Sequence, residues 1–249
     1  MKKILLLVLT CVSILSHAQT NFEKTVQIKA GQKLSINFDD PDIRIQTWDK
    51  NEILIKGTVS INRGENDAAF GLDVNVTTPE VTITSTLKDK ESLPKRITIK
   101  KGETEYYFKT DNFNDPEIQK FIEQNGKDYS YSSVGIIKDI KLEIFVPKNT
   151  ETKIIAKHGL VEVKNFSAPL TIQSQYGGVD ATVTSQNAGE LLARSRYGEI
   201  LTNLDIKFDQ TKPVDKSDKW TEISAKIGSG PKYNFESKYG NVYLRKPKP

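Results

Sequence analysis

A short phrase that recurs near the C-terminus constrains the fold of this chain more than any other feature. It reads S-Q-Y-G-G-V at Ser174 to Val179, S-R-Y-G-E-I at Ser195 to Ile200, and S-K-Y-G-N-V at Ser237 to Val242. Two degenerate copies begin at Ala156 (A-K-H-G-L-V) and Ala225 (A-K-I-G-S-G). A phrase that returns at such short intervals along the chain predicts stacked β-strand repeats, each of which buries its apolar face only against its neighbours.

Alignment of the copies on the residue before the glycine defines a ring column, which contains His158, Tyr176, Tyr197, Ile227 and Tyr239. Two residues earlier every copy has a small residue, and four residues earlier every copy has an apolar one. Because side chains alternate along a strand, a regular strand would turn all three columns inward. We therefore expect the rings to stack in the core or at a corner. An exposed aromatic ladder that grips sugar rings is the alternative.

A glycine follows the ring column in every copy, and glycine permits a sharp bend or bulge where a side chain does not fit. The predicted structural repeat therefore combines the ring column with these glycines. Its members are His158, Tyr176, Tyr197, Tyr239, Gly159, Gly177, Gly198 and Gly240. Such a bend would lead each strand into the next side of a coil.

A basic column lies one residue before the ring column, on the side expected to face solvent. It contains Lys157, Arg196, Lys226 and Lys238, with Gln175 at the remaining copy. Cations repeated on neighbouring strands repel one another, and a bound polyanion would offset that repulsion. These four residues are the candidate ligand-binding residues. The alternative is a solvated lysine face that prevents edge-to-edge aggregation.

Upstream of the phrase the chain alternates apolar and polar residues from Thr25 to Ile99, as short β-strands do. Between them and the phrase, Asp115 is a predicted helix cap, Pro116 the first helical residue and Gly126 the end. The aromatic residues around this helix are expected to pack it onto a sheet; a ligand site is the alternative. We expect one elongated β domain over 19–249, with N-terminal strands in 19–100, an insertion in 101–135, and glycine-ended repeats in 136–249 that a loop at 207–219 interrupts.

The first eighteen residues have the pattern of a cleavable signal peptide. Lys2 and Lys3 precede an apolar run that ends at Leu15, and Ser16-His17-Ala18 is a small-x-small cleavage site. Lipoprotein processing at Cys11 is disfavoured because Thr10 is a poor residue before the cysteine. The sequence thus predicts export to the periplasm, the cell surface or the medium, with no transmembrane span in the mature chain.

Cleavage after Ala18 would leave no cysteine and a single histidine, His158. A disulfide framework and a Cys/His zinc site are then excluded, and a Ser-His-Asp triad would need His158. Without Lys2 and Lys3 the 36 basic residues fall to 34, against 32 acidic ones. This balance indicates no nucleic-acid function, and no motif indicates a cofactor or a metal.

Two segments are similar to a known family. D-I-R-I-Q-T-W-D-K-N-E-I-L-I-K-G, from Asp42 to Gly57, and K-L-E-I-F-V-P-K-N-T, from Lys141 to Thr150, resemble the bacterial "putative adhesin" family of β-strand-repeat domains of unknown function. The resemblance implies a right-handed, single-stranded β-helix or β-roll-like solenoid and an exported location. It implies no catalytic residues. The expected fold class is therefore all-β, a solenoid of this type with one short helical insertion.

Three functions fit these observations. The favoured one is an exported, non-enzymatic, adhesin-like or envelope-associated module that binds an anionic glycan or another envelope protein through a solenoid face. A polysaccharide-acting β-helix enzyme is the second, and Asp39, Asp40 and Asp42 are its candidate carboxylates, although their place around Pro41 favours a turn. A scaffold or sensor in an envelope-stress pathway is the third.

Overall fold

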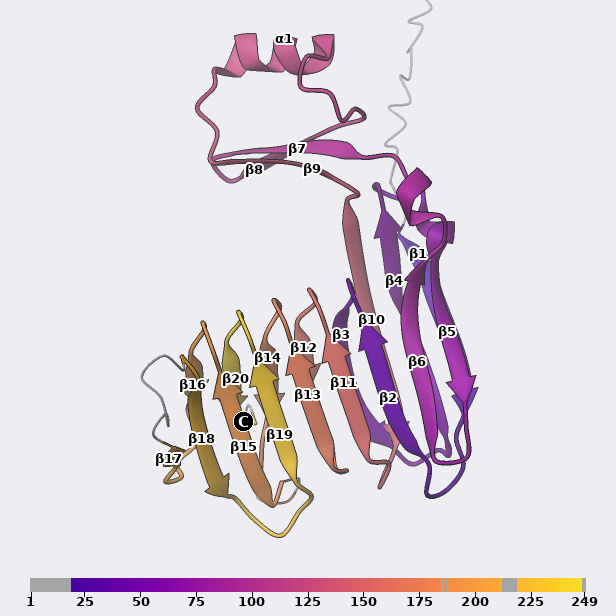
Figure 1. The fold of residues 1–249 in the computed structure, drawn as a ribbon, viewed down its shortest axis with the longest axis vertical. Helices are drawn as coiled ribbons and strands as arrows, with labels where there is room; N and C mark the ends of the chain where they lie inside the picture. The colour runs from indigo at the N-terminus through magenta and orange to yellow at the C-terminus, as the bar shows by residue number, and fades with distance from the viewer. Residues whose placement is uncertain (1–18, 185, 187, 212–218, 248–249) are drawn as a thin grey trace, which may run out of the picture.

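Two large β-sheets lie face to face, and a small third sheet with one helix stands at one end of them (Figure 1). This arrangement comes from a computed structural model that describes residues 19–184, 186, 188–211 and 219–247. The predicted signal peptide and Cys11 lie outside the described residues. Among the helices that are described, none is long and apolar enough to cross a membrane.

The eight-stranded sheet has the order β1-β4-β10-β3-β12-β14-β20-β16. Its strands are β1 (Thr20–Gln27), β4 (Glu52–Ile61), β10 (Lys138–Pro147), β3 (Asp42–Trp48), β12 (Val161–Val163), β14 (Val179–Thr182), β20 (Val242–Arg245) and β16 (Ile200–Thr202).

The nine-stranded sheet has the order β17-β18-β15-β19-β13-β11-β2-β6-β5. Its strands are β17 (Asp209–Thr211), β18 (Thr221–Lys226), β15 (Glu190–Ser195), β19 (Tyr233–Ser237), β13 (Leu170–Ser174), β11 (Thr152–Ala156), β2 (Lys33–Phe38), β6 (Glu80–Leu87) and β5 (Phe70–Val76). Two short 3-10 helices, η1 (Asp67–Ala69) and η2 (Lys90–Ser92), flank the β5–β6 hairpin.

The all-β prediction is confirmed, but the single-stranded β-helix or β-roll-like solenoid is wrong. A solenoid adds parallel strands in chain order, whereas both large sheets here are mixed and sandwich-like. β1 pairs with β4, β4 with β10, β5 with β6, and β15 with β18, all antiparallel. In addition, β19 lies between β13 and β15, and β20 lies between β14 and β16. The repeated phrase specifies how a strand crosses from one sheet to the other, but leaves open which strand becomes its neighbour.

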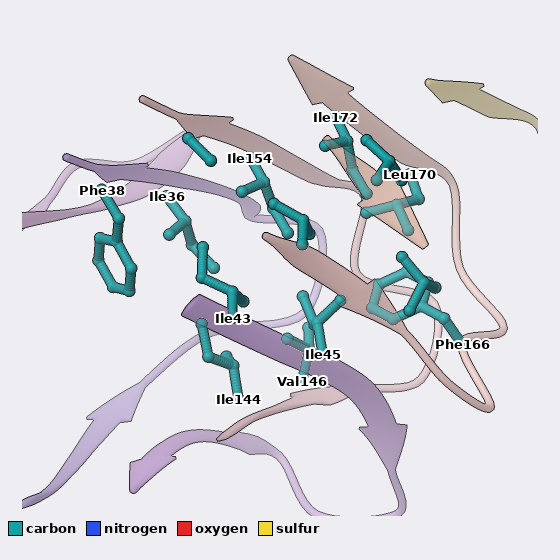
Figure 2. Close-up of a cluster of buried hydrophobic side chains, with 14 of the residues drawn as sticks. Ile36, Phe38, Ile43, Ile45, Ile144, Val146, Ile154, Phe166, Leu170 and Ile172 are labelled. Carbon is teal, nitrogen blue, oxygen red and sulfur yellow. The ribbon is translucent and has the colours of Figure 1, made fainter. Parts of the chain in front are cut away.

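The core fills the space between the two large sheets. Alternation along each strand turns every second side chain inward, as in Ile36 of β2, Ile45 of β3 and Ile154 of β11, all fully buried. Figure 2 shows such residues from both sheets, with Phe166 closing the cluster at one side. Burial of a side chain of this size contributes roughly 1.5–3 kcal/mol, so the repeated apolar columns supply the main stabilisation of the sandwich.

The third sheet contains β8 (Thr104–Phe108), β7 (Arg96–Lys101) and β9 (Tyr131–Gly135), and helix α1 (Pro116–Asn125) covers one face of it. The predicted helix is present: the Asp115 carboxylate accepts a hydrogen bond from the Glu117 amide at 2.9 Å. The ring of Phe121 lies 4.7 Å from that of Tyr106 and 5.4 Å from that of Phe108. The local aromatic residues therefore pack the helix onto its sheet.

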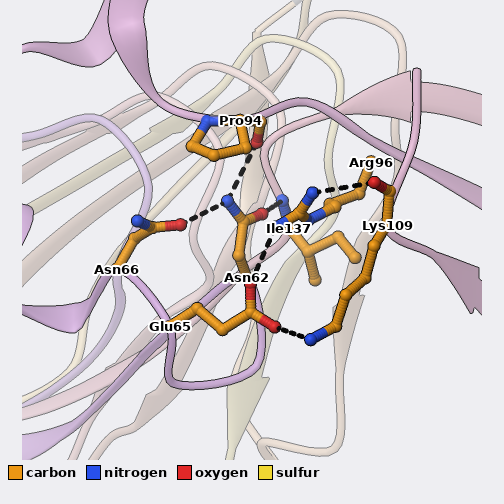
Figure 3. A network of polar contacts seen from close by, with 7 residues as sticks. All are labelled: Asn62, Glu65, Asn66, Pro94, Arg96, Lys109 and Ile137. Atoms are coloured by element: carbon orange, nitrogen blue, oxygen red, sulfur yellow. Dashed lines mark hydrogen bonds and ion pairs between the residues drawn. The ribbon is translucent and has the colours of Figure 1, made fainter.

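A polar network joins this small unit to the sandwich (Figure 3). The Asn62 side chain donates to the Pro94 carbonyl at 2.9 Å and accepts from the Ile137 amide at 3.1 Å. Glu65 forms an ion pair with Arg96 at 2.7 Å. Since Asn62 is only 3 % exposed, satisfying its amide fixes how the chain leaves the sandwich and returns to it.

Candidate functional site

The repeated phrase forms the corners at which the chain passes from the nine-stranded to the eight-stranded sheet. In four of the five copies the incoming strand ends at the small residue, and the outgoing strand starts five residues later, as with Ser174 and Val179. Ala156 lies opposite Ser174, Ser174 opposite Ser237, and Ser237 opposite Ser195. The corners are therefore aligned in the order 158, 176, 239, 197, which differs from chain order.

The rings of the corners form one stack, which we call the aromatic ladder: His158, Tyr176, Tyr239 and Tyr197. Successive ring centroids are 5.0, 5.1 and 5.0 Å apart, and neighbouring planes differ by no more than 10°. The three tyrosines are 44–48 % exposed. Stacking on neighbouring strands was expected, but the predicted inward orientation is wrong.

Strand alternation does not reach the rings because the strands end before them. β13 ends at Ser174, two residues before Tyr176, and β19 ends at Ser237, two residues before Tyr239. The chain is already bending there, held by a hydrogen bond from the Tyr239 amide to the Gln175 carbonyl at 2.9 Å. Side chains at a bend follow the turn rather than a period of two, and here they point to solvent.

The small residue of the phrase stabilises the bend. The Ser174 hydroxyl accepts a hydrogen bond from the Gly178 amide at 2.8 Å, and the Ser237 hydroxyl accepts one from the Gly240 amide at 3.0 Å. Ser195 accepts from the Gly198 amide at 3.2 Å in the same way. These serines are buried, so each satisfies its own hydroxyl while it caps a turn amide. Sequence reasoning recognised the residues as small but missed the capping role.

The glycine of the phrase is required by close approach of neighbouring corners. A Cβ atom on Gly177 would lie 2.1 Å from the Gly159 carbonyl oxygen, and a Cβ atom on Gly159 would lie 1.7 Å from the Pro41 carbonyl oxygen. Both contacts are with backbone, which cannot swing away. Serine and glycine in the phrase thus have structural causes, whereas nothing in the packing demands a ring between them.

Three members of the predicted basic column lie beside the ladder, and one does not. Lys157, Lys238 and Arg196 each precede a ladder residue, in the order 157, 175, 238, 196. The Lys238 ammonium and the Arg196 guanidinium each lie 5.2 Å from the adjacent tyrosine ring centroid. Within the described part of the chain, these three cations form no ion pair with a carboxylate.

Lys226 lies away from this surface. It ends β18, which runs antiparallel to β15, and it is opposite Glu190 at the start of that strand. The copy that begins at Ala225 is therefore not a corner of the same kind, and Ile227 is not part of the ladder. The candidate ligand surface consists of Lys157, Lys238 and Arg196 together with the ladder.

The three aspartates considered as catalytic carboxylates form the corner that precedes His158. Asp40 forms an ion pair with Lys138, and Asp42 accepts a hydrogen bond from the Leu160 amide at 2.8 Å. The backbone carbonyl of Asp39 accepts from the His158 amide at 2.8 Å. The cavity beside Asp39 and Asp40 has a volume of only about 60 Å³. These contacts give two of the carboxylates a structural use, and the small cavity beside Asp39 and Asp40 is too small for a sugar ring.

Among the described residues, no group of three or more His, Cys, Asp or Glu side chains is placed to hold a metal ion.

Comparison with known proteins gives two weak likenesses. A Clostridium sporogenes structure named "putative cell adhesion protein" is 10 % identical, covers 92 % of this chain and 100 % of its own, and has a TM-score of 0.47. A Bacteroides fragilis "putative adhesin" is 11 % identical, covers 93 % and 99 %, and has a TM-score of 0.23. No family model and no curated protein matches the chain. Since both TM-scores are below 0.5, neither likeness carries an argument about this molecule.

Proposed function

We propose that the chain is an exported, non-enzymatic, adhesin-like module that binds an anionic glycan along the aromatic ladder. The observation that carries the proposal is the solvent exposure of a stacked row of rings flanked by Lys157, Lys238 and Arg196. The fold has a structural reason for the serines and glycines of the phrase, but none for three exposed tyrosines. The pattern of the first eighteen residues supports export.

The geometry of the ladder favours contact through ring edges and phenol hydroxyls. Because each ring face inside the stack is covered by the next ring at about 5 Å, a sugar ring cannot lie flat on it. The hydroxyls instead form a row of donors and acceptors at the spacing of the strands. The adjacent cations can pair with carboxylate or sulfate groups of a glycan. The ladder therefore suits a charged polymer that runs across the strands.

Charge reversal at the three cations tests the proposal. We expect Lys157→Glu, Arg196→Glu and Lys238→Glu together to weaken binding of hyaluronan at least about tenfold, since hydrogen bonds to charged groups contribute roughly 1.5–3 kcal/mol each. The measurement is calorimetry with the mature chain at low and physiological salt. Tyr239→Ala, which interrupts the ladder, should weaken binding as well.

A second triple variant controls for net charge. Lys153, Lys226 and Lys232 are exposed and lie away from the ladder, so their reversal to Glu changes the total charge by the same amount. We expect this variant to bind as the unchanged chain does. Equal loss in both triple variants would mean that binding depends on total charge, and would overturn the assignment to the ladder.

A further inference from the structure

A groove with a volume of about 740 Å³ lies on the outer face of the eight-stranded sheet. It crosses β1, β4, β10, β3 and β12 at right angles to the strands, because its lining residues lie opposite one another in the register of all five. Four strand spacings correspond to roughly 19 Å. The groove is thus long and narrow, a shape that fits a chain molecule.

The floor of the groove is backbone. Phe22, Gly57, Leu142 and Ile43 lie in one transverse row, and the side chains of Leu142 and Ile43 are buried in the core. A Cβ atom on Gly57 would lie 1.9 Å from the Lys141 carbonyl oxygen, so β4 and β10 leave no room for a side chain there. The floor is therefore low and even between two rows of outward side chains.

One wall of the groove alternates in charge from strand to strand. Its residues, in spatial order, are Glu23, Lys56, Glu143, Arg44 and Glu162. Lys56 lies 3.6 Å from Glu143, and Arg44 lies 2.7 Å from Glu162. Partial burial raises the pKa of Glu162, but hydrogen bonds from Lys164 and Arg44 outweigh that effect and hold the pKa below its ordinary value. The wall offers donors and acceptors in turn, and four of its five charges are neutralised in pairs.

The opposite wall is mostly uncharged. Asn21, Thr58, Lys141, Asp42 and Leu160 form it, and Leu160 lies two residues beyond His158, the first ring of the ladder. The corners of the ladder lead into β12, β14, β20 and β16, while the groove crosses from β12 to β1. The groove and the ladder therefore follow one another along the same sheet.

We propose that the groove binds an uncharged run of the glycan whose charged part lies on the ladder, an inference that rests on the proposed function. The groove lining has three cations and four carboxylates, so a uniformly anionic polymer would be repelled there. Sugar hydroxyl and amide groups, in contrast, can pair with both kinds of charge. In an extended β-linked glycan the advance from sugar to sugar is close to one strand spacing, which places about one sugar over each strand.

Oligosaccharide length and groove filling test this inference. A hyaluronan tetrasaccharide can cover the ladder, and a decasaccharide made of that tetrasaccharide followed by six neutral N-acetylglucosamine residues can continue into the groove with its uncharged part. We expect the decasaccharide to bind the mature chain at least about tenfold more tightly than the tetrasaccharide. Thr58→Trp should fill the groove and remove this gain while leaving tetrasaccharide affinity unchanged. Ser60→Trp, on the same face of β4 but outside the groove, is the matched control and should keep the gain.

Three results decide whether the groove binds the glycan. No length gain, or equal behaviour of Thr58→Trp and Ser60→Trp with both folded by circular dichroism, overturns the groove. Should Thr58→Trp fail to fold, Lys141→Glu, an exposed change in the same wall, replaces it with the same expectation. A neutral oligomer of N-acetylglucosamine separates the two proposals: if it binds and Thr58→Trp abolishes that binding while hyaluronan tetrasaccharide does not bind at all, the groove stands and the ladder function fails.

Discussion

Strand β19 has a tyrosine at its start and another just beyond its end, and the two lie in opposite environments. Tyr233 is fully buried at one edge of the sandwich, where its hydroxyl donates to the Phe166 carbonyl. Tyr239 is 44 % exposed at the other edge and lies between two further tyrosines. The tyrosine that the core needs occurs once, whereas the tyrosines that repeat are on the surface. In this molecule the tyrosines that repeat in the sequence mark an exposed surface, and substitutions along β19 can test this contrast.

Removing each ring in turn should give the largest contrast. We expect Tyr233→Ala to lower the free energy of unfolding by about 3–5 kcal/mol, because it leaves a cavity and an unpaired carbonyl. Tyr239→Ala should cost about 1 kcal/mol, since it removes two exposed ring contacts. Urea unfolding followed by circular dichroism measures both. Similar losses for the two variants would show that the ladder is part of the stabilising structure.

Alkaline pH should lower stability in part through the buried ring. Burial raises the pKa of Tyr233 above its ordinary value of 10.0. Above that pH the unfolded chain loses this proton while the folded chain keeps it, so stability is present below pH 10.0 and declines as pH rises, by up to about 1.4 kcal/mol per unit. Tyr233→Phe keeps the ring and removes the titration, and it should show a shallower decline in unfolding free energy over the same range. Parallel curves for the two proteins would contradict the burial argument.

The serine between these tyrosines should show the smallest of the three effects. Ser237→Ala removes the hydroxyl that accepts from the Gly240 amide at 3.0 Å, and we expect a loss of about 1 kcal/mol. Ser237→Thr keeps the hydroxyl as a comparison, although its methyl group must fit in the core. The ladder beside the turn should loosen, so hydrogen exchange at the Gly240 amide is the second measurement. Unchanged exchange would mean that the bend does not depend on its cap.

The sequence was sufficient for features that local chemistry decides. Asp115, Pro116 and Gly126 specify the helix, and the alternating apolar residues specify the strands and their inner faces. It was insufficient for features that depend on distant neighbours. The pairing of β19 between β13 and β15 leaves no mark in the local pattern. The outward turn of Tyr176 was missed because strand alternation was extended two residues too far.

The sequence contains one signal from which the exposure of the rings could have been predicted. A serine three residues before a glycine suggests that the hydroxyl caps a bend, and a residue inside such a bend is not subject to strand parity. Lys226 shows that a local match can also mislead. Its local sequence matches the phrase, but its strand runs antiparallel to β15. A repeat can be read as a set of equivalent corners only after the direction of each strand is known.

The position of β19 and β20 gives the C-terminal segment a role in assembly. Both strands fill gaps between strands that come earlier in the chain, so neither large sheet is continuous until residues 233–245 are in place. A chain shortened before Tyr233 would leave β13, β15, β14 and β16 with open edges inside the sandwich, where they could pair with other chains. It would also leave Tyr176 and Tyr197 without the ring that joins them. Residues 233–245 therefore complete both sheets and the ladder together.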